Sequence, residues 1–98
     1  MNSINSIATG ALQAFSVSQQ VSAHNMANIS TDGFKSSNTI FQANGNGGVT
    51  AEVFGSQDSV DISREAVNML SNSQGYKTNS KVLQTADDMT KQLLNIKK

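Results

Sequence analysis

Residues 25–35, NMANISTDGFK, combine several features of a helix end. The amides of Asn25 and Asn28 can bond backbone groups that the last turns of a helix leave without partners. Thr31 favours a turn, and Gly33 permits the positive φ with which many helices terminate. The stretch therefore predicts a helix that stops near residue 28 and a chain that leaves it at Gly33.

The segment before this stop has the periodicity of an amphipathic helix from about residue 3 to residue 28, which Asn2 or Ser3 can cap. Residues 1–31 contain no Asp, Glu, Lys or Arg, whereas a helix with one face in water usually carries charge there. Either this helix faces other protein surfaces, or the missing charge is a chance feature of a Ser/Asn-rich segment. The residues expected to pack are Ile4, Ile7, Ala11, Ala14 and Val21, with Leu12, Phe15 and Val17 beside them.

A second helix is predicted from about residue 61 to residue 96, with Asp61 as its N-cap. Gly75 is a weak point within it, since glycine costs about 1 kcal/mol relative to alanine in a helix. The apolar stripe slips near Asn79, as a stutter does in a heptad pattern. The stripe consists of Ile62, Ala66, Met69, Ser73 and Tyr76, followed by Val82, Leu83, Ala86, Met89, Leu93 and Ile96.

The middle segment has two short runs of β-branched and aromatic residues, TIFQ at 39–42 and VTAEVF at 49–54. The glycine-rich run ANGNGG separates them, so the pattern predicts a short β-hairpin. Two strands alone are marginally stable in water. The segment is therefore either a hairpin supported by its neighbours or disordered until assembly.

These elements predict a mainly α fold: two long antiparallel helices forming a coiled-coil-like hairpin, with a short irregular or β-hairpin segment between them. The segments are 1–33, 34–60 and 61–98. At 1.5 Å per residue the helices would be about 39 and 53 Å long, so part of the second would extend beyond the first. Self-association or assembly with similar chains follows, with the helices paired either within or between chains.

Composition argues against several classes of function. The net charge of zero lacks the basic excess of a nucleic-acid-binding surface, and the absence of cysteine removes thiolate metal sites. No apolar run is long enough for a membrane span, and the N-terminus lacks the features of a cleaved signal peptide. His24 has no nearby ligand set, and Asp87 and Asp88 point to different sides of a helix. We expect no catalytic, cofactor-binding or metal residue, and no enzymatic activity.

Residues at both ends resemble the axial proteins of the bacterial flagellum, which form the rod, hook and hook-associated structures. The C-terminal run VDISREAVNMLSNSQGYKTNSKVLQTADDMTKQLLNI is similar to the terminal helix of the rod proteins. Asp32 and Gly75 depart from the pattern, where many relatives have proline and a larger residue. The N-terminal signature is matched by Asn25, Met26, Ala27, Asn28, Thr31, Gly33, Phe34 and Lys35.

The resemblance implies a structural subunit of the basal-body rod, of the small proximal-rod type because the middle segment is short. Such proteins leave the cell unfolded through the flagellar type III export apparatus, without a cleaved signal. Their terminal helices pack with copies of themselves and with other axial subunits into a periplasm-spanning tube. The alternative is a helical-hairpin adaptor or export-related accessory protein that uses the same fold.

Overall fold

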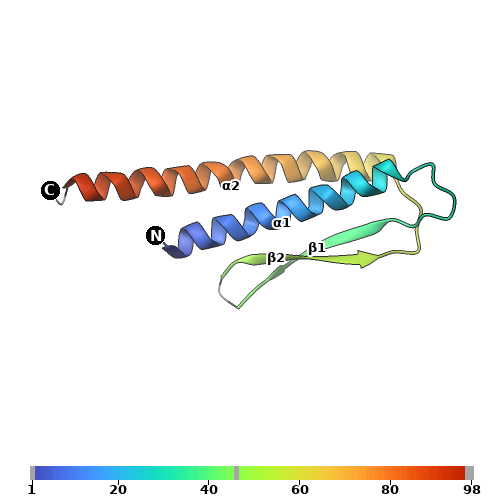
Figure 1. Ribbon diagram of the computed structural model, residues 1–98, viewed down its shortest axis with the longest axis horizontal. Coiled ribbons are helices and arrows are strands. Elements are labelled where there is room, and N and C mark those ends of the chain that lie inside the picture. Colours follow the sequence, from blue (N-terminus) through green and yellow to red (C-terminus); the bar gives the residue numbers. More distant parts are fainter. Residues whose placement is uncertain (1, 46, 97–98) are drawn as a thin grey trace.

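The computed structural model describes residues 2–45 and 47–96 and confirms the predicted fold class (Figure 1). Two long helices run antiparallel, and a β-hairpin connects them. The elements in chain order are α1 (Asn2–Ala27), β1 (Ser37–Ala43), β2 (Val49–Gly55) and α2 (Ile62–Ile96).

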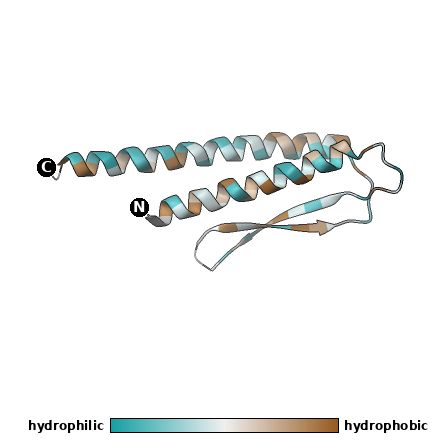
Figure 2. Ribbon diagram, viewed as in Figure 1, coloured by the Kyte–Doolittle hydropathy of each residue, from teal (hydrophilic) through white to brown (hydrophobic). Residues whose placement is uncertain are grey.

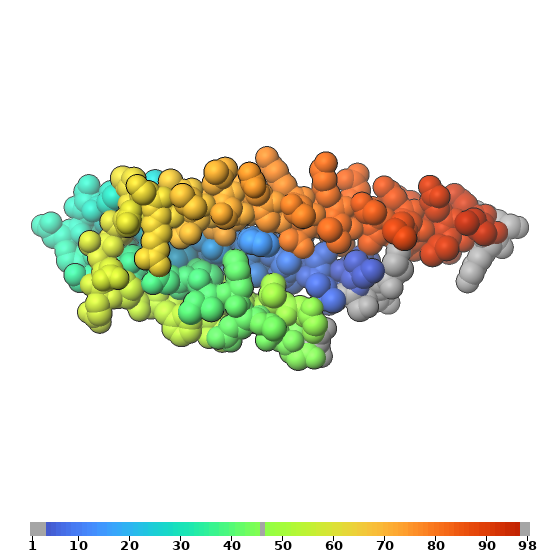
Figure 3. Space-filling model, turned by 180° about the vertical axis from the view of Figure 1, so that it is seen from behind, coloured from blue at the N-terminus to red at the C-terminus, as the bar shows by residue number. Residues whose placement is uncertain are grey.

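Helix α1 lies between α2 and the hairpin (Figure 3). The molecule is elongated, with extents of 64 × 25 × 14 Å. Its accessible surface is 6831 Å². A compact monomer of 10.4 kDa would expose about 5,400 Å². The single chain therefore leaves an unusually large share of its surface uncovered.

The hairpin confirms the strand prediction and extends it by a few residues. Its antiparallel register pairs Ser37 with Gly55 at one end and Ala43 with Val49 at the other. Asn44 shapes the turn. Its side-chain Oδ1 accepts a hydrogen bond from the Gly48 backbone amide at 3.1 Å, and its backbone amide donates to the Gly48 carbonyl at 2.9 Å. The hairpin packs along α1, which supplies the support that two strands need.

The interior between α1, α2 and the hairpin, here called the seam, consists mainly of small and polar side chains. On α1 the buried positions recur at three- and four-residue intervals, as in a coiled coil. On α2 the buried side chains are Glu65, Asn72 and Ala86. Small side chains leave room for two backbones to approach closely, but they bury little apolar area. The buried residues of α1 are Ala8, Ala11, Ala14, Ser18, Ser22 and Asn25.

The beginning of α2 corrects the predicted stripe. Ile62 and Ala66, expected on the packing face, are exposed, and Glu65 is buried in their place. The reason is a polar contact: Asn25 of α1 donates a hydrogen bond to the Glu65 carboxylate at 3.1 Å. This contact fixes the rotation of α2 about its own axis near the start of the helix. Ile62 and Ala66 therefore face solvent.

Candidate functional site

The chain leaves α1 through the turn that the sequence predicted. The Asn28 side-chain amide donates to the His24 carbonyl at 2.9 Å, and the Thr31 hydroxyl donates to Asn28 Oδ1 at 3.2 Å. Gly33 has a φ of +76°. The ring of Phe34 then packs edge-to-face on His24, with the ring centroids 5.5 Å apart. The local motif therefore ends the helix and folds the chain back on its last turn.

Replacing Gly33 by valine is expected to destabilise the fold by about 1 to 2 kcal/mol, because a β-branched residue is strained at positive φ. A Cβ at this position would have no atom within 4 Å, so the loss reports backbone strain alone. Gly33→Asn is the matched control and should lose much less, since asparagine tolerates this conformation. Urea denaturation followed by circular dichroism measures both, and equal losses would contradict the explanation.

Asn25, in the same motif, joins three elements rather than capping the helix. Its side chain is completely buried. Nδ2 donates to the Ser37 carbonyl at 2.8 Å and to Glu65 Oε2 at 3.1 Å, while Oδ1 accepts from the Ser37 amide at 3.0 Å. The amide thus uses both donor hydrogens and its acceptor to connect the end of α1 to the start of β1 and of α2.

The open end of the hairpin is held by a second group of hydrogen bonds. The Ser36 amide donates to the Asp58 carbonyl at 2.9 Å, and the Ser56 amide donates to the Ser36 carbonyl at 2.9 Å. The two serine hydroxyls lie 3.0 Å apart. Asp61 caps α2, since its Oδ1 accepts from the Arg64 amide at 3.2 Å. Both connections to the helices are therefore fixed by polar contacts.

Phe15 provides the main aromatic contact between the elements. Its ring meets Phe41 of β1 edge-to-face, with 5.2 Å between centroids. On the other side it lies against Gly75 of α2, where any added Cβ would overlap the ring. Gly75, predicted as a weak point, is thus the position at which α2 makes room for Phe15.

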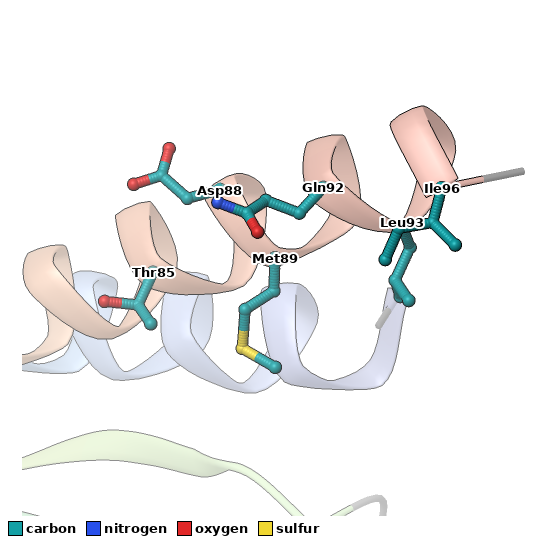
Figure 4. Close-up of a pocket in the computed structure, with 6 residues that line it drawn as sticks. All are labelled: Thr85, Asp88, Met89, Gln92, Leu93 and Ile96. Carbon is teal, nitrogen blue, oxygen red and sulfur yellow. The ribbon is translucent and has the colours of Figure 1, made fainter. Parts of the chain in front are cut away.

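The large apolar side chains mostly face outward. The C-terminal end of α2 continues past the start of α1, and apolar residues recur along this extension (Figures 1 and 2). Met89 and Leu93 point to one side of the helix and Asp88 to the other (Figure 4). Together with Gln92 and Ile96 these residues line an open hollow of about 410 Å³. Leu93 is 54% exposed and Ile96 78% exposed.

The residues predicted to pack are divided between the seam and the outside. Ala11, Ala14 and Ala86 are buried in the single chain, so an assembly role for the others stays a prediction. Periodicity of apolar residues missed Ser18, Ser22, Glu65 and Asn72, although small residues at heptad spacing in α1 were a usable signal. Phe15, Val21, Met69 and Leu83 are partly exposed, and Ile4, Ile7, Tyr76, Val82, Met89, Leu93 and Ile96 are exposed.

Within residues 2–45 and 47–96, no three His, Cys, Asp or Glu side chains lie together as metal ligands would. Neither α1 nor α2 has an apolar stretch long enough to cross a membrane. Because large apolar side chains of both helices are exposed, the candidate site is a surface: the outward apolar faces of a two-helix hairpin, held in place by the polar contacts at the end of α1.

Two models of known protein families match this chain, and both describe proteins of the flagellar basal-body rod. Residues 6–35 match the family described as flagella basal body rod protein, and residues 58–96 match the C-terminal family of the flagellar basal body rod FlgEFG proteins. Among curated proteins no relative was found. The two matches cover more than half of the chain and leave only the hairpin region between them.

The chain belongs to the flagellar basal-body rod proteins. Membership supports a structural role in the rod, a location in the flagellar basal body, and assembly with other rod subunits.

Proposed function

We propose that this chain is a structural subunit that enters the rod through the outward faces of its two terminal helices, packing against copies of itself and other axial subunits. The observation that carries the proposal is the inverted distribution of side chains. The buried residues are small or polar, while Ile4, Leu93 and Ile96 are exposed. Such a seam buries little apolar area, so the free monomer has low stability, and an assembly would cover the rest.

The uneven helix lengths favour an open assembly. Helix α1 has 26 residues and α2 has 35, and the C-terminal end of α2 extends past the start of α1 (Figure 1). If this end packs on a different surface of the next subunit, the contact is heterologous. Repeated contacts of this kind generate a helical tube instead of a closed dimer.

The hairpin and the uncharged N-terminal segment support the finer assignments. The hairpin is short, with strands of seven residues each that pack along α1, which suits a narrow proximal section of the rod. Passage through the flagellar export apparatus, without a cleaved signal, would deliver the chain to the periplasm-spanning structure.

Mass spectrometry of purified hook–basal bodies tests the proposal directly. The chain should be present in a fixed ratio to a known rod subunit, and deletion of its gene should abolish motility. Absence from the particle, with the chain found soluble in the cytoplasm, would instead support the adaptor or accessory role.

Leu93→Asp is expected to lower incorporation into rods at least tenfold, because it places a charge on an apolar surface that assembly would cover. The unfolding free energy of the single chain should change by less than about 0.5 kcal/mol, since Leu93 is exposed there. Asn95→Asp is the matched control: it adds the same charge two residues away, on the side of α2 that already carries Asp88. Rods that accept both variants equally would contradict the packing of this face.

A further inference from the structure

A second feature lies apart from the apolar surface: a polar cavity of about 210 Å³ between α1, β1 and α2. This is far more room than one water needs, roughly 10–15 Å³ on the same measure. Glu65, Asn72 and Thr39 line it, and the exposed residues Asn68 and Ser71 of α2 lie at its edge. The cavity therefore has space for a side chain that enters from solvent.

Glu65 makes this cavity unusual, because the residue is only 3% exposed and forms no ion pair with a basic side chain of the described residues. Its one side-chain hydrogen bond in the described part of the chain comes from the neutral amide of Asn25. The ion pair between Lys91 Nζ and Asp87 Oδ2, 3.4 Å apart, lies far from Glu65, near the opposite end of α2. A buried carboxylate without a counter-charge is costly, and water supplies hydrogen bonds but no charge.

Two further polar groups in the cavity lack partners among the described residues. Nδ2 of Asn72, a residue only 5% exposed, has no hydrogen-bond acceptor, and the hydroxyl of Thr39 has no partner either. Buried polar groups are nearly always hydrogen-bonded in folded proteins. Turning the Asn72 amide about its last torsion exchanges oxygen for nitrogen at the same place. The cavity then offers a carboxylate, an amide oxygen and a hydroxyl to one entering group with several donors.

We infer that this cavity binds the guanidinium or ammonium group of an arginine or lysine from an adjacent rod subunit, which forms an ion pair with Glu65. An arginine fits the set best, because its planar group carries five donors and no acceptor. The inference rests on the proposed assembly, since the cation comes from a neighbouring chain. It adds a charged, geometrically specific contact to the apolar contacts proposed for the outward faces of the helices.

The first test compares incorporation of variants into purified hook–basal bodies by mass spectrometry, with wild-type incorporation already established. Glu65→Gln keeps an oxygen for Asn25 but removes the charge, and should lower incorporation at least tenfold. Glu52→Gln is the matched control, the same change on an exposed strand residue, and should incorporate as wild type.

Thr39→Val tests whether the cavity contributes to incorporation even if Glu65→Gln fails to fold. It removes a hydroxyl that has no partner within the described chain and leaves the Asn25–Glu65 hydrogen bond intact. We expect unchanged helical circular dichroism and about threefold lower incorporation. If both single variants incorporate as wild type, the inference is overturned and the cavity holds only water. The same conclusion holds if Glu65→Gln does not fold and Thr39→Val incorporates as wild type.

The source of the cation is tested separately. Second-site motile revertants of Glu65→Lys should replace a basic residue of an axial subunit by an acidic or neutral one. Revertants that leave every basic residue unchanged would overturn the inference. Basal bodies that lose the chain on dialysis, and retain it when N-methylguanidinium is present, would show a free cation instead of a subunit side chain. Normal wild-type incorporation in all these cases would leave the proposed rod function standing.

Discussion

Asn25→Ala is expected to destabilise the folded chain by about 3 kcal/mol, the largest effect among the substitutions considered for the fold. The buried amide makes three hydrogen bonds, to both backbone groups of Ser37 and to the Glu65 carboxylate. Alanine would leave each of these groups without its partner in the interior, and a buried unsatisfied group costs about 1 to 3 kcal/mol. The start of β1 and the rotation of α2 both depend on this residue.

Asn28→Ala is the matched control for this prediction, because it is the same substitution three residues further along the same motif. Asn28 is only partly exposed, but its amide bonds to the local His24 carbonyl and to Thr31 and not to another element. A loss of about 0.5 to 1 kcal/mol is expected, as for other helix-end contacts. Urea denaturation in trimethylamine N-oxide, which favours the folded state, measures both variants. Equal losses would show that Asn25 acts only as a local cap.

Gly75→Ala is expected to destabilise the chain by about 2 to 3 kcal/mol, although alanine is the better helix former by about 1 kcal/mol. The added methyl group would overlap the ring of Phe15, which Phe41 holds from the other side. Overpacking of this kind forces side chains off their rotamers or moves the backbones apart. Thermal unfolding followed by circular dichroism measures the change.

Gly10→Ala provides the matched control, the same substitution in the interior of α1. A Cβ there would meet the Val49 carbonyl oxygen at 3.7 Å, an ordinary contact, so this variant should be stabilised by about 0.5 to 1 kcal/mol. Phe15→Leu should restore part of the stability lost in Gly75→Ala. A double-mutant cycle that gives no coupling between positions 15 and 75 would contradict the steric explanation.

The contacts of Phe15 with Phe41 and Gly75 mean that a polar substitution of Phe15 would test folding as well as assembly. From the sequence, Phe15→Asp and Leu93→Asp are both expected to block assembly while leaving export largely intact. In the fold, Phe15 joins α1 to β1 and α2, whereas Leu93 lies exposed on the extension of α2. We therefore expect Phe15→Asp to unfold the hairpin before assembly is reached, and Leu93→Asp to act on assembly alone.

The polar seam explains why a protein with so little apolar packing still has one arrangement of its elements. Alanine and serine let the helices approach, while Asn25 and Glu65 select the rotation and register in which their hydrogen bond forms. We infer that in this chain the interior polar contacts serve mainly to specify one arrangement of the elements. The apolar faces are then free for contacts with other subunits.

Local chemistry made several features predictable. The run at residues 25–35 predicted the helix end and the positive φ of Gly33, both confirmed. Asp61 as the cap of α2 and the hairpin around residues 43–48 were also confirmed, because turns and caps depend on residues only a few positions apart. The family signature lies in these same local motifs, so both ends of the chain could be recognised.

The positions that sequence reasoning misplaced depend on contacts between distant residues. Asn25 was expected to satisfy backbone groups of its own helix, and Gly75 was expected to be a weak point. Apolar periodicity put Ile62 on the packing face and could not find Glu65, since a buried glutamate is stable only where a donor such as Asn25 faces it.

By itself the sequence determined two helices, their ends, the hairpin between them and the family to which the chain belongs. Only the tertiary structure decided which face of α2 meets α1, why Gly75 must be small, and that a buried carboxylate lies beside a polar cavity. The physical reason is one of range. Turns, caps and periodicity act over a few residues, whereas the partner of a buried polar group or of an aromatic ring is set by where the whole chain places it.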